Sequence, residues 1–311
     1  METGAPDRRL AGRLCLRCDD ALTTFAVLPT CPGWAGQRAL GRPDGVGRWM
    51  ICAAGCDSGG MINQQQLWDE DAAKQYDTPG EGMFSPEVLG PTVEVLSRLA
   101  GNGPAVEFAI GTGRVAIPLW EAGVQVSGIE LSHAMISRLR EKVGEDHIPV
   151  VQGDMTEAAA GENFSLAFLV FNTIANLLTQ DEQVRCFQNA ARHLARCGRF
   201  VVELWVPQLR SLPPGHRATV EVSEPGYLLV DTYDVLRQHV ISHHVRFGPE
   251  LSDGRDARIG RTPHRYIWPS ELDLMARMAG FELESRWADW DHSEFTAESR
   301  SHVSVYRLAA R

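Results

Sequence analysis

The chain has 311 residues, enough to bury one large core or two small ones, and its apolar fraction of 44% and charged fraction of 23% are typical of globular proteins. Its formal net charge of −10 argues against nucleic-acid and membrane-surface partners, because neither favours an acidic surface. No apolar run approaches the roughly 20 residues that span a bilayer. We therefore expect a cytoplasmic protein with no nucleic-acid and no membrane partner.

The first sixty residues differ in composition from the rest. They contain no Lys and no His, and they hold five of the seven cysteines. Two short-spaced pairs with one spare cysteine are a candidate zinc site, formed by Cys15, Cys18, Cys52, Cys56 and Cys31. Because the pairs lie far apart and no strand-and-turn pattern frames them, we predict no metal site. We expect residues 1–60 to be a disordered or non-native extension, with translation starting near Met61.

Regular hydrophobic patterns begin after this stretch. A short amphipathic helix is predicted over 64–75, and Tyr76-Asp77 follows it directly. Ser85 and Pro86 open a second helix, because serine is a common N-cap and proline is tolerated in the first helical turn.

Five alternations of strand and helix come next. Each predicted strand is a short apolar run, and each predicted helix has one apolar face. The strands are expected over 105–110, 124–129, 148–152, 165–171 and 199–205, and the helices over 114–122, 132–143 and 181–195, the last stopped by Cys197-Gly198. This order predicts an α/β fold with a seven-stranded, mostly parallel, Rossmann-like sheet and helices on both faces. We place the core of this fold at about 86–206.

The pattern changes after the fifth strand. Period-two alternation predicts a small antiparallel sheet, inserted at about 215–268 as a lid over the carboxyl ends of the parallel strands. Its strands are expected over 218–222, 227–233, 239–247 and 258–268. A helix over 271–279, capped by Ser270, and strands over 281–287 and 303–308 complete the fold within residues 269–311.

Acidic and amide residues follow four successive parallel strands. In such sheets a ligand binds outside the carboxyl ends of the strands, so these residues are expected to lie together at one site. The set comprises Glu107 with the glycines Gly111 and Gly113, then Glu130, Asp154 and Asn172.

Gly111-x-Gly113-x-x-Ala116, with Glu130 nineteen positions after Gly111, also satisfies the dinucleotide fingerprint of an NAD-dependent dehydrogenase. Three features count against this alternative. Glu107 stands where that fingerprint has an apolar residue, Asp154 provides a second acidic strand end, and the antiparallel insert replaces the second nucleotide-binding half.

Residues 64–311 resemble the class I S-adenosylmethionine-dependent methyltransferases, so we expect 61–311 to be one methyltransferase domain. The family's first motif is acid-x-Gly-x-Gly-x-Gly, and Glu107 to Gly113 match it except that Ala109 replaces the first glycine. The resemblance implies S-adenosylmethionine as the cofactor. It also implies that Glu107 faces the methionine end, while Gly111 and Gly113 allow a close approach of the backbone.

The resemblance assigns the remaining strand ends as well. Glu130, with Leu131 beside it, would take the ribose hydroxyls. Asp154 would accept a hydrogen bond from the adenine amino group, and Met155 would pack against the adenine ring. Asn172, in Phe171-Asn172-Thr173, matches the fourth motif beside the transferable methyl. Tyr76 resembles the tyrosine that many members place over the cofactor.

The carboxyl-terminal part resembles small-molecule methyltransferases with an inserted sheet over the active site. We therefore expect a small-molecule acceptor that is methylated on nitrogen or oxygen, and a homodimer is compatible with this class. A macromolecular acceptor or a non-catalytic cofactor-binding protein are the alternatives. The candidate catalytic residues are Tyr76, Asn172, His243 and His264. His243 and His244 are neighbours in a predicted strand, so at most one of them can face the pocket.

Overall fold

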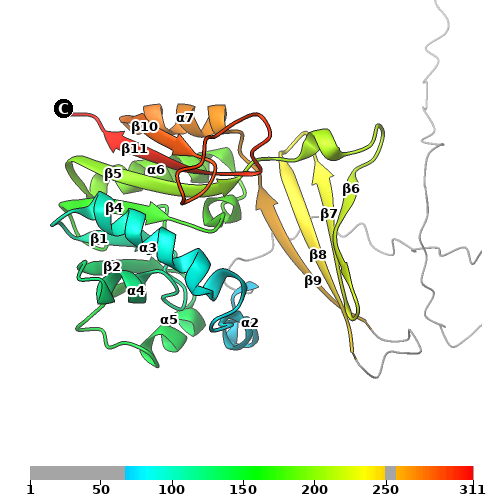
Figure 1. Cartoon of the computed structure of the whole chain (residues 1–311), viewed down its shortest axis with the longest axis horizontal. Coiled ribbons are helices and arrows are strands. Elements are labelled where there is room, and N and C mark those ends of the chain that lie inside the picture. Colours follow the sequence, from blue (N-terminus) through cyan, green and yellow to red (C-terminus); the bar gives the residue numbers. More distant parts are fainter. Residues whose placement is uncertain (1–66, 249–256, 311) are drawn as a thin grey trace, which may run out of the picture. The chain divides into compact units, whose positions relative to one another are not determined.

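The computed structural model describes residues 67–248 and 257–310 (Figure 1). The hypotheses about an extension and a zinc site concern residues 1–60 and lie outside the described residues. Within the described ranges, no helix combines the length and the hydropathy needed to cross a bilayer.

A seven-stranded sheet is the centre of the described part of the chain (Figure 1). The first five strands of the chain pair in parallel, and the last strand, residues 301–308, lies antiparallel between residues 194–205 and residues 281–287. In spatial order the strands are β10 (Phe281–Trp287), β11 (Ser301–Leu308), β5 (Leu194–Trp205), β4 (Phe164–Leu169), β1 (Ala105–Phe108), β2 (Val126–Glu130) and β3 (Val150–Gln152). The predicted α/β fold is confirmed.

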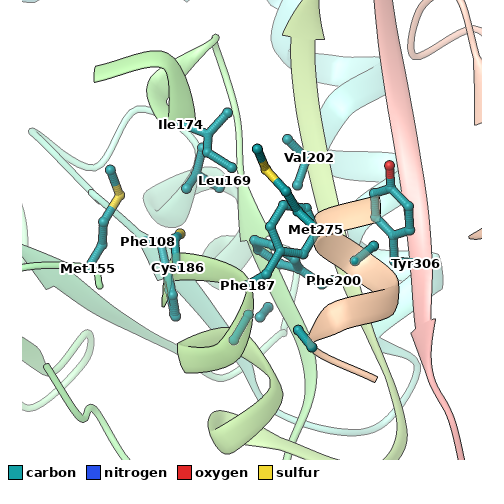
Figure 2. Packing of buried hydrophobic residues seen from close by; sticks show 14 of the residues in the cluster. Phe108, Met155, Leu169, Ile174, Cys186, Phe187, Phe200, Val202, Met275 and Tyr306 are labelled. Atoms are coloured by element: carbon teal, nitrogen blue, oxygen red, sulfur yellow. The ribbon is translucent and has the colours of Figure 1, made fainter. Parts of the chain in front are cut away.

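Helices cover both faces because the side chains of the strands alternate between two apolar clusters. One cluster joins Phe108 and Phe200 of the sheet to Phe187 and Met275 of the helices, and Figure 2 shows these rings and the thioether packed together. The other cluster joins the opposite face of the strands to the first helices. The helices are α3 (Pro86–Ala100), α4 (Ala116–Glu121) and α5 (His133–Arg140) on that second face, and α6 (Gln180–His193) and α7 (Pro269–Met278) on the first.

The predicted insert is a four-stranded antiparallel sheet, which we call the lid. Its strands follow one another in space as they do in sequence: β6 (Ala218–Glu224), β7 (Tyr227–Asp234), β8 (His239–Phe247) and β9 (Ala257–Arg265). The lid is anchored where β8 begins and β9 ends. His239 Nε2 lies 2.9 Å from the Leu178 carbonyl, and Arg265 donates to Gln183 and Glu271.

The boundary between α6 and β5 differs from the prediction. The helix ends at His193 rather than at Ala195, and β5 starts at once with Leu194, so Cys197-Gly198 lies inside a strand. Leu194 pairs with Phe164, and a register shift after this pair accommodates Cys197 at φ 62°. An apolar cross-strand pair therefore outweighs the helical period of the sequence.

Two smaller predictions are also corrected. Trp268, not Ser270, is the N-cap of α7, because Pro269 occupies the first helical turn, where its missing N–H and fixed φ are tolerated. The strand expected to reach Phe171 ends at Leu169, and Phe171 itself has φ 55°. Phe171 and Asn172 both have positive φ, and the chain turns at these residues at the edge of the sheet.

Substitution of Gly113 by alanine should destabilise the fold more than substitution of Gly123. Both glycines have positive φ, which costs an alanine about 1–2 kcal/mol, but only at Gly113 would the new Cβ lie 2.3 Å from the buried Leu139 Cδ1. Overpacking adds about 1–3 kcal/mol. Urea unfolding of both variants without cofactor measures the difference, and equal losses would contradict this packing argument.

Candidate cofactor site

The turn after β1 uses backbone conformations that are rare outside glycine. Ala109 has φ 52°, Gly111 φ 59° and Gly113 φ 83°. Ala109 stands where the family motif has its first glycine, and a left-handed alanine costs about 1–2 kcal/mol relative to a right-handed one. The turn presents its backbone, with little side-chain bulk, at the carboxyl edge of the sheet.

Glu130 holds this turn from the neighbouring strand. Its Oε2 accepts from the Gly111 N–H at 2.8 Å, and its Oε1 accepts from the Ser132 N–H at 2.8 Å. Burial raises the pKa of Glu130, while these backbone N–H groups lower it. Each carboxylate oxygen can accept a second hydrogen bond, so the residue can also take hydroxyl donors of a ligand. Leu131 lies between Glu130 and Ser132 at the start of α5.

Glu107 is buried at the end of β1 with an unsatisfied oxygen. Its Oε2 has no hydrogen-bond partner, and burial raises the pKa of Glu107 to about 8, partly offset by the Arg114 guanidinium and the Ala116 N–H. A buried polar atom without a partner is costly, so a ligand that brings a cation or a donor here is favoured. The ammonium of a methionine moiety fits this requirement.

Arg114 is a site residue that the sequence analysis missed. Its guanidinium lies 5.0 Å from the centre of the Phe171 ring, and Nη1 donates to the Met83 carbonyl at 3.2 Å. Its positive charge also lowers the pKa of both Tyr76 and Glu107. Its position directly after Gly113 was the available signal.

Tyr76 is brought to this cluster from the segment that precedes the sheet. Its ring meets the rings of Trp68 and Phe84 edge-on, at 5.8 and 5.9 Å between centres. Burial raises the pKa of Tyr76, with Arg114 acting against it, so the hydroxyl keeps its proton at neutral pH. Arg114 and the electrostatic influence of Glu107 connect Tyr76 to the glycine turn.

Asp154 and Met155 follow β3, the strand beside β2 at the end of the sheet. Asp154 Oδ1 accepts from the Thr156 N–H at 2.7 Å. Met155 is buried in the core cluster, and its carbonyl accepts from the Asn189 side chain at 2.9 Å. The pair thus continues the row of strand ends that begins with Glu107 and Glu130.

Asn172 follows β4 and is hydrogen-bonded to β5. It has φ 63°, its Oδ1 accepts from the Trp205 N–H at 2.7 Å, and its own N–H donates to the Glu203 carbonyl at 3.2 Å. Phe171 before it is also left-handed, and its N–H donates to Glu203 Oε2 at 2.8 Å. Consecutive left-handed residues other than glycine concentrate at functional sites. The sequence analysis did not identify Glu203 as a site residue.

The two predicted histidines lie on opposite faces of the lid. His264 pairs with Val240, whereas His243 pairs with Arg261, and the odd spacing between Val240 and His243 puts them on different faces. His264 meets the Trp205 ring edge-on at 6.2 Å and has a buried Nδ1 without a partner. Burial lowers the pKa of His264 to about 4.

His243 instead lies within hydrogen-bond distance of Thr232 Oγ1, at 2.9 Å. The structure therefore brings Tyr76 to the glycine turn, and His264 to Asn172 through Trp205, but it does not bring His243 to either.

Comparisons with known proteins agree with this geometry. Residues 105–198 match a family model described as a methyltransferase domain. The solved structure of the CcbJ methyltransferase from Streptomyces caelestis is 35% identical, covers 78% of this chain and 96% of its own, and has a TM-score of 0.66. The cypemycin N-terminal methyltransferase of a Streptomyces species is 24% identical, over 78% of this chain and 98% of its own.

A dTDP-4-amino-2,3,4,6-tetradeoxy-D-glucose N,N-dimethyltransferase from Saccharopolyspora spinosa is 33% identical, over 45% of this chain and 56% of its own. The chain belongs to the class I S-adenosylmethionine-dependent methyltransferases, and S-adenosylmethionine is its cofactor. The dehydrogenase alternative is thereby excluded.

The Glu107→Gln substitution should flatten the pH dependence of stability without cofactor. The pKa of Glu107 rises from an ordinary 4.5 to about 8 on folding, so the folded state keeps a proton that the unfolded state releases. The resulting stabilisation is complete below pH 4.5 and is lost as the pH rises to about 8. Urea unfolding from pH 4.5 to 8.5 tests this, with Glu157→Gln at an exposed acid as the control. If the free energy of unfolding changed equally with pH in the wild type, Glu107→Gln and Glu157→Gln, the raised pKa of Glu107 would be contradicted.

Proposed function

We propose that this enzyme transfers a methyl group from S-adenosylmethionine to an amine nitrogen of a small-molecule acceptor bound between Asn172 and the lid. The observation that carries the proposal is the contact of the His264 ring with the Trp205 ring. The backbone N–H of Trp205 donates a hydrogen bond to Asn172 Oδ1. This contact joins the face of the lid that carries His264, which we call the inner face, to the strand end that the family places beside the transferable methyl.

Named relatives support the nitrogen acceptor. One is named as a cypemycin N-terminal methyltransferase, and another as an N,N-dimethyltransferase of an amino sugar nucleotide. The net charge of −10 also disfavours nucleic acid as acceptor. A macromolecular acceptor remains the second candidate, and the assay below separates the two.

The inner face of the lid is suited to a polar acceptor. Asp231, Ser242 and His264 share this face, because Asp231 pairs with Ser242, and Ser242 stands two residues from Val240, the partner of His264. Asp231 Oδ1 and His264 Nδ1 are both buried without a hydrogen-bond partner. Two unsatisfied polar atoms on one face favour a ligand that carries hydrogen-bonding groups.

The protonation states favour nitrogen over oxygen. A hydroxyl acceptor benefits from a base, but the lowered pKa of His264, about 4, makes it a weak one. Tyr76 stays protonated because burial raises its pKa, and the Glu203 carboxylate already accepts the Phe171 N–H. A neutral amine needs no proton removed before it attacks, so this site requires only orientation of the acceptor.

The cofactor supplies an activated methyl group on its sulfonium. Glu107 would hold its ammonium, Glu130 its ribose hydroxyls and Asp154 its adenine amino group, while Met155 would pack against the adenine. Tyr76 and the lid exclude water from the site, and neutral His264 orients the acceptor beside Asn172. Orientation of the acceptor and exclusion of water by these residues would supply most of the rate.

The cofactor assignment is tested by calorimetric titration of S-adenosylmethionine and its demethylated product, S-adenosylhomocysteine, into the full chain. Glu130→Ala should lose micromolar binding, because the Gly111 turn is released and the hydroxyl partner is removed. Glu141→Ala, an exposed acid in a surface ion pair, should bind as the wild type does. Retained binding in Glu130→Ala would contradict the assigned role.

The acceptor class is tested by transfer of a labelled methyl group to panels of small amines, small alcohols, peptides and RNA. Label on small amines is the expected result. Label restricted to alcohols, or to peptides and RNA, would overturn the nitrogen or the small-molecule assignment respectively.

His264→Gln should raise KM for the amine acceptor about tenfold, the value of one lost hydrogen bond. The pH profile of kcat should not change between pH 6 and 9, because the imidazole, with a pKa of about 4, is already neutral there. Steady-state kinetics of the two proteins checks both expectations. Loss of a titration in this range would instead identify His264 as a base.

A further inference from the structure

The segment before α3 crosses the cofactor turns and is fastened to them. We call residues 68–84 the strap; it carries α2 (Glu70–Tyr76) and the short helix η1 (Gly82–Phe84). Ser132 Oγ donates to the Trp68 carbonyl at 2.5 Å, and Arg114 donates to the Met83 carbonyl. Both ends of the strap are thus attached to residues that adjoin the cofactor-binding positions.

Asp77 makes the central attachment. Its Oδ1 accepts from Thr112 Oγ1 at 2.5 Å, and its Oδ2 accepts from Lys142 Nζ at 2.8 Å. Thr112 lies between the two motif glycines and is fully buried, so its hydroxyl loses its partner if Asp77 moves away. Lys142 follows α5, the helix that begins beside Glu130. One carboxylate therefore bridges the glycine turn and the residue that follows the carboxyl end of α5.

Asp77 also determines where Tyr76 lies. It is the C-cap of α2 and has extended backbone geometry, φ −77° and ψ 121°, so it directly follows the last helical residue, Tyr76. With Asp77 fixed on Thr112, the tyrosine ring is held between Trp68 and Phe84. Departure of the strap would break the Thr112 bond, the Lys142 ion pair and the Tyr76 contacts together.

We propose that Asp77 is a positioning residue that fastens the strap, and with it Tyr76, over the bound cofactor, and that it thereby sets the lifetime of the cofactor complex. This inference rests on the proposed function, because it takes the glycine turn as the cofactor site. It assigns Asp77 no contact with the reacting atoms.

The test measures the dissociation rate of S-adenosylhomocysteine from the full chain. A preformed complex is mixed with excess S-adenosylmethionine, and tryptophan fluorescence, to which Trp68 of the strap contributes, is followed by stopped flow. Asp77→Ala and Thr112→Val should each release the ligand about tenfold faster. Thr112→Ser, which keeps the hydroxyl, and Asp71→Ala, at an exposed acid of the same helix, should behave as the wild type does.

A double-mutant cycle distinguishes a positioning role of Asp77 from a general effect on the stability of the fold. The double variant Asp77→Ala/Thr112→Val should release ligand no faster than either single variant, because both remove the same hydrogen bond. Tyr76→Ala should speed release in the wild type but have little further effect in Asp77→Ala. Should Asp77→Ala not fold, Lys142→Met, which alters the exposed side of the same carboxylate, replaces it and should speed release two- to fivefold.

The outcomes separate the two proposals. A wild type that does not bind S-adenosylhomocysteine would overturn the proposed function itself. A wild type that binds, with Asp77→Ala and Thr112→Val within twofold of its release rate, would overturn the role of Asp77 alone. Equal acceleration by Asp71→Ala, or additive effects in the double variant, would show that Asp77 only stabilises the fold.

Discussion

The carboxylate of Glu130 is the interaction on which the cofactor edge depends. It accepts the Gly111 N–H with one oxygen and the Ser132 N–H with the other, so a single buried group joins the turn after β1 to the start of α5. Burial disfavours the charge of Glu130, so both N–H groups are needed to stabilise the carboxylate. Movement of either turn would remove one of these hydrogen bonds, and the positions of the two turns are therefore coupled. The strap is fastened to the same two places, at Thr112 and Ser132.

Electrostatics divides this edge into two regions of different character. Around the glycine turn, Arg114 is the cation that faces Glu107, Tyr76 and the Phe171 ring. Around the lid, His264 is neutral and next to aromatic surface. The region around the glycine turn suits the charged end of an amino acid, whereas the region around the lid suits a neutral nucleophile that must be desolvated.

Much of the fold could be predicted because its elements are long and strongly periodic. The lid strand over 239–247 and the edge strand over 281–287 have the predicted bounds, and the row of polar strand ends lies along one edge of the sheet. The end of α6 could not be predicted, since pairing of Leu194 with Phe164 decides it. Arg114 contacts Met83 and Asp77 contacts Thr112, and because each contact joins two different elements, no local pattern could predict it, although the position of Arg114 after Gly113 marked it as a candidate. Tyr76 was found only through a family resemblance.

The position of β11 has a consequence for biosynthesis. It lies between β5 and β10, yet it is made after both of them, so the two strands emerge from the ribosome with facing edges unpaired. An unpaired edge of apolar residues such as Val201 invites association with other chains. The sheet can close only when residues 301–308 have been synthesised, so the facing edges of β5 and β10 stay open to association after the cofactor half is complete.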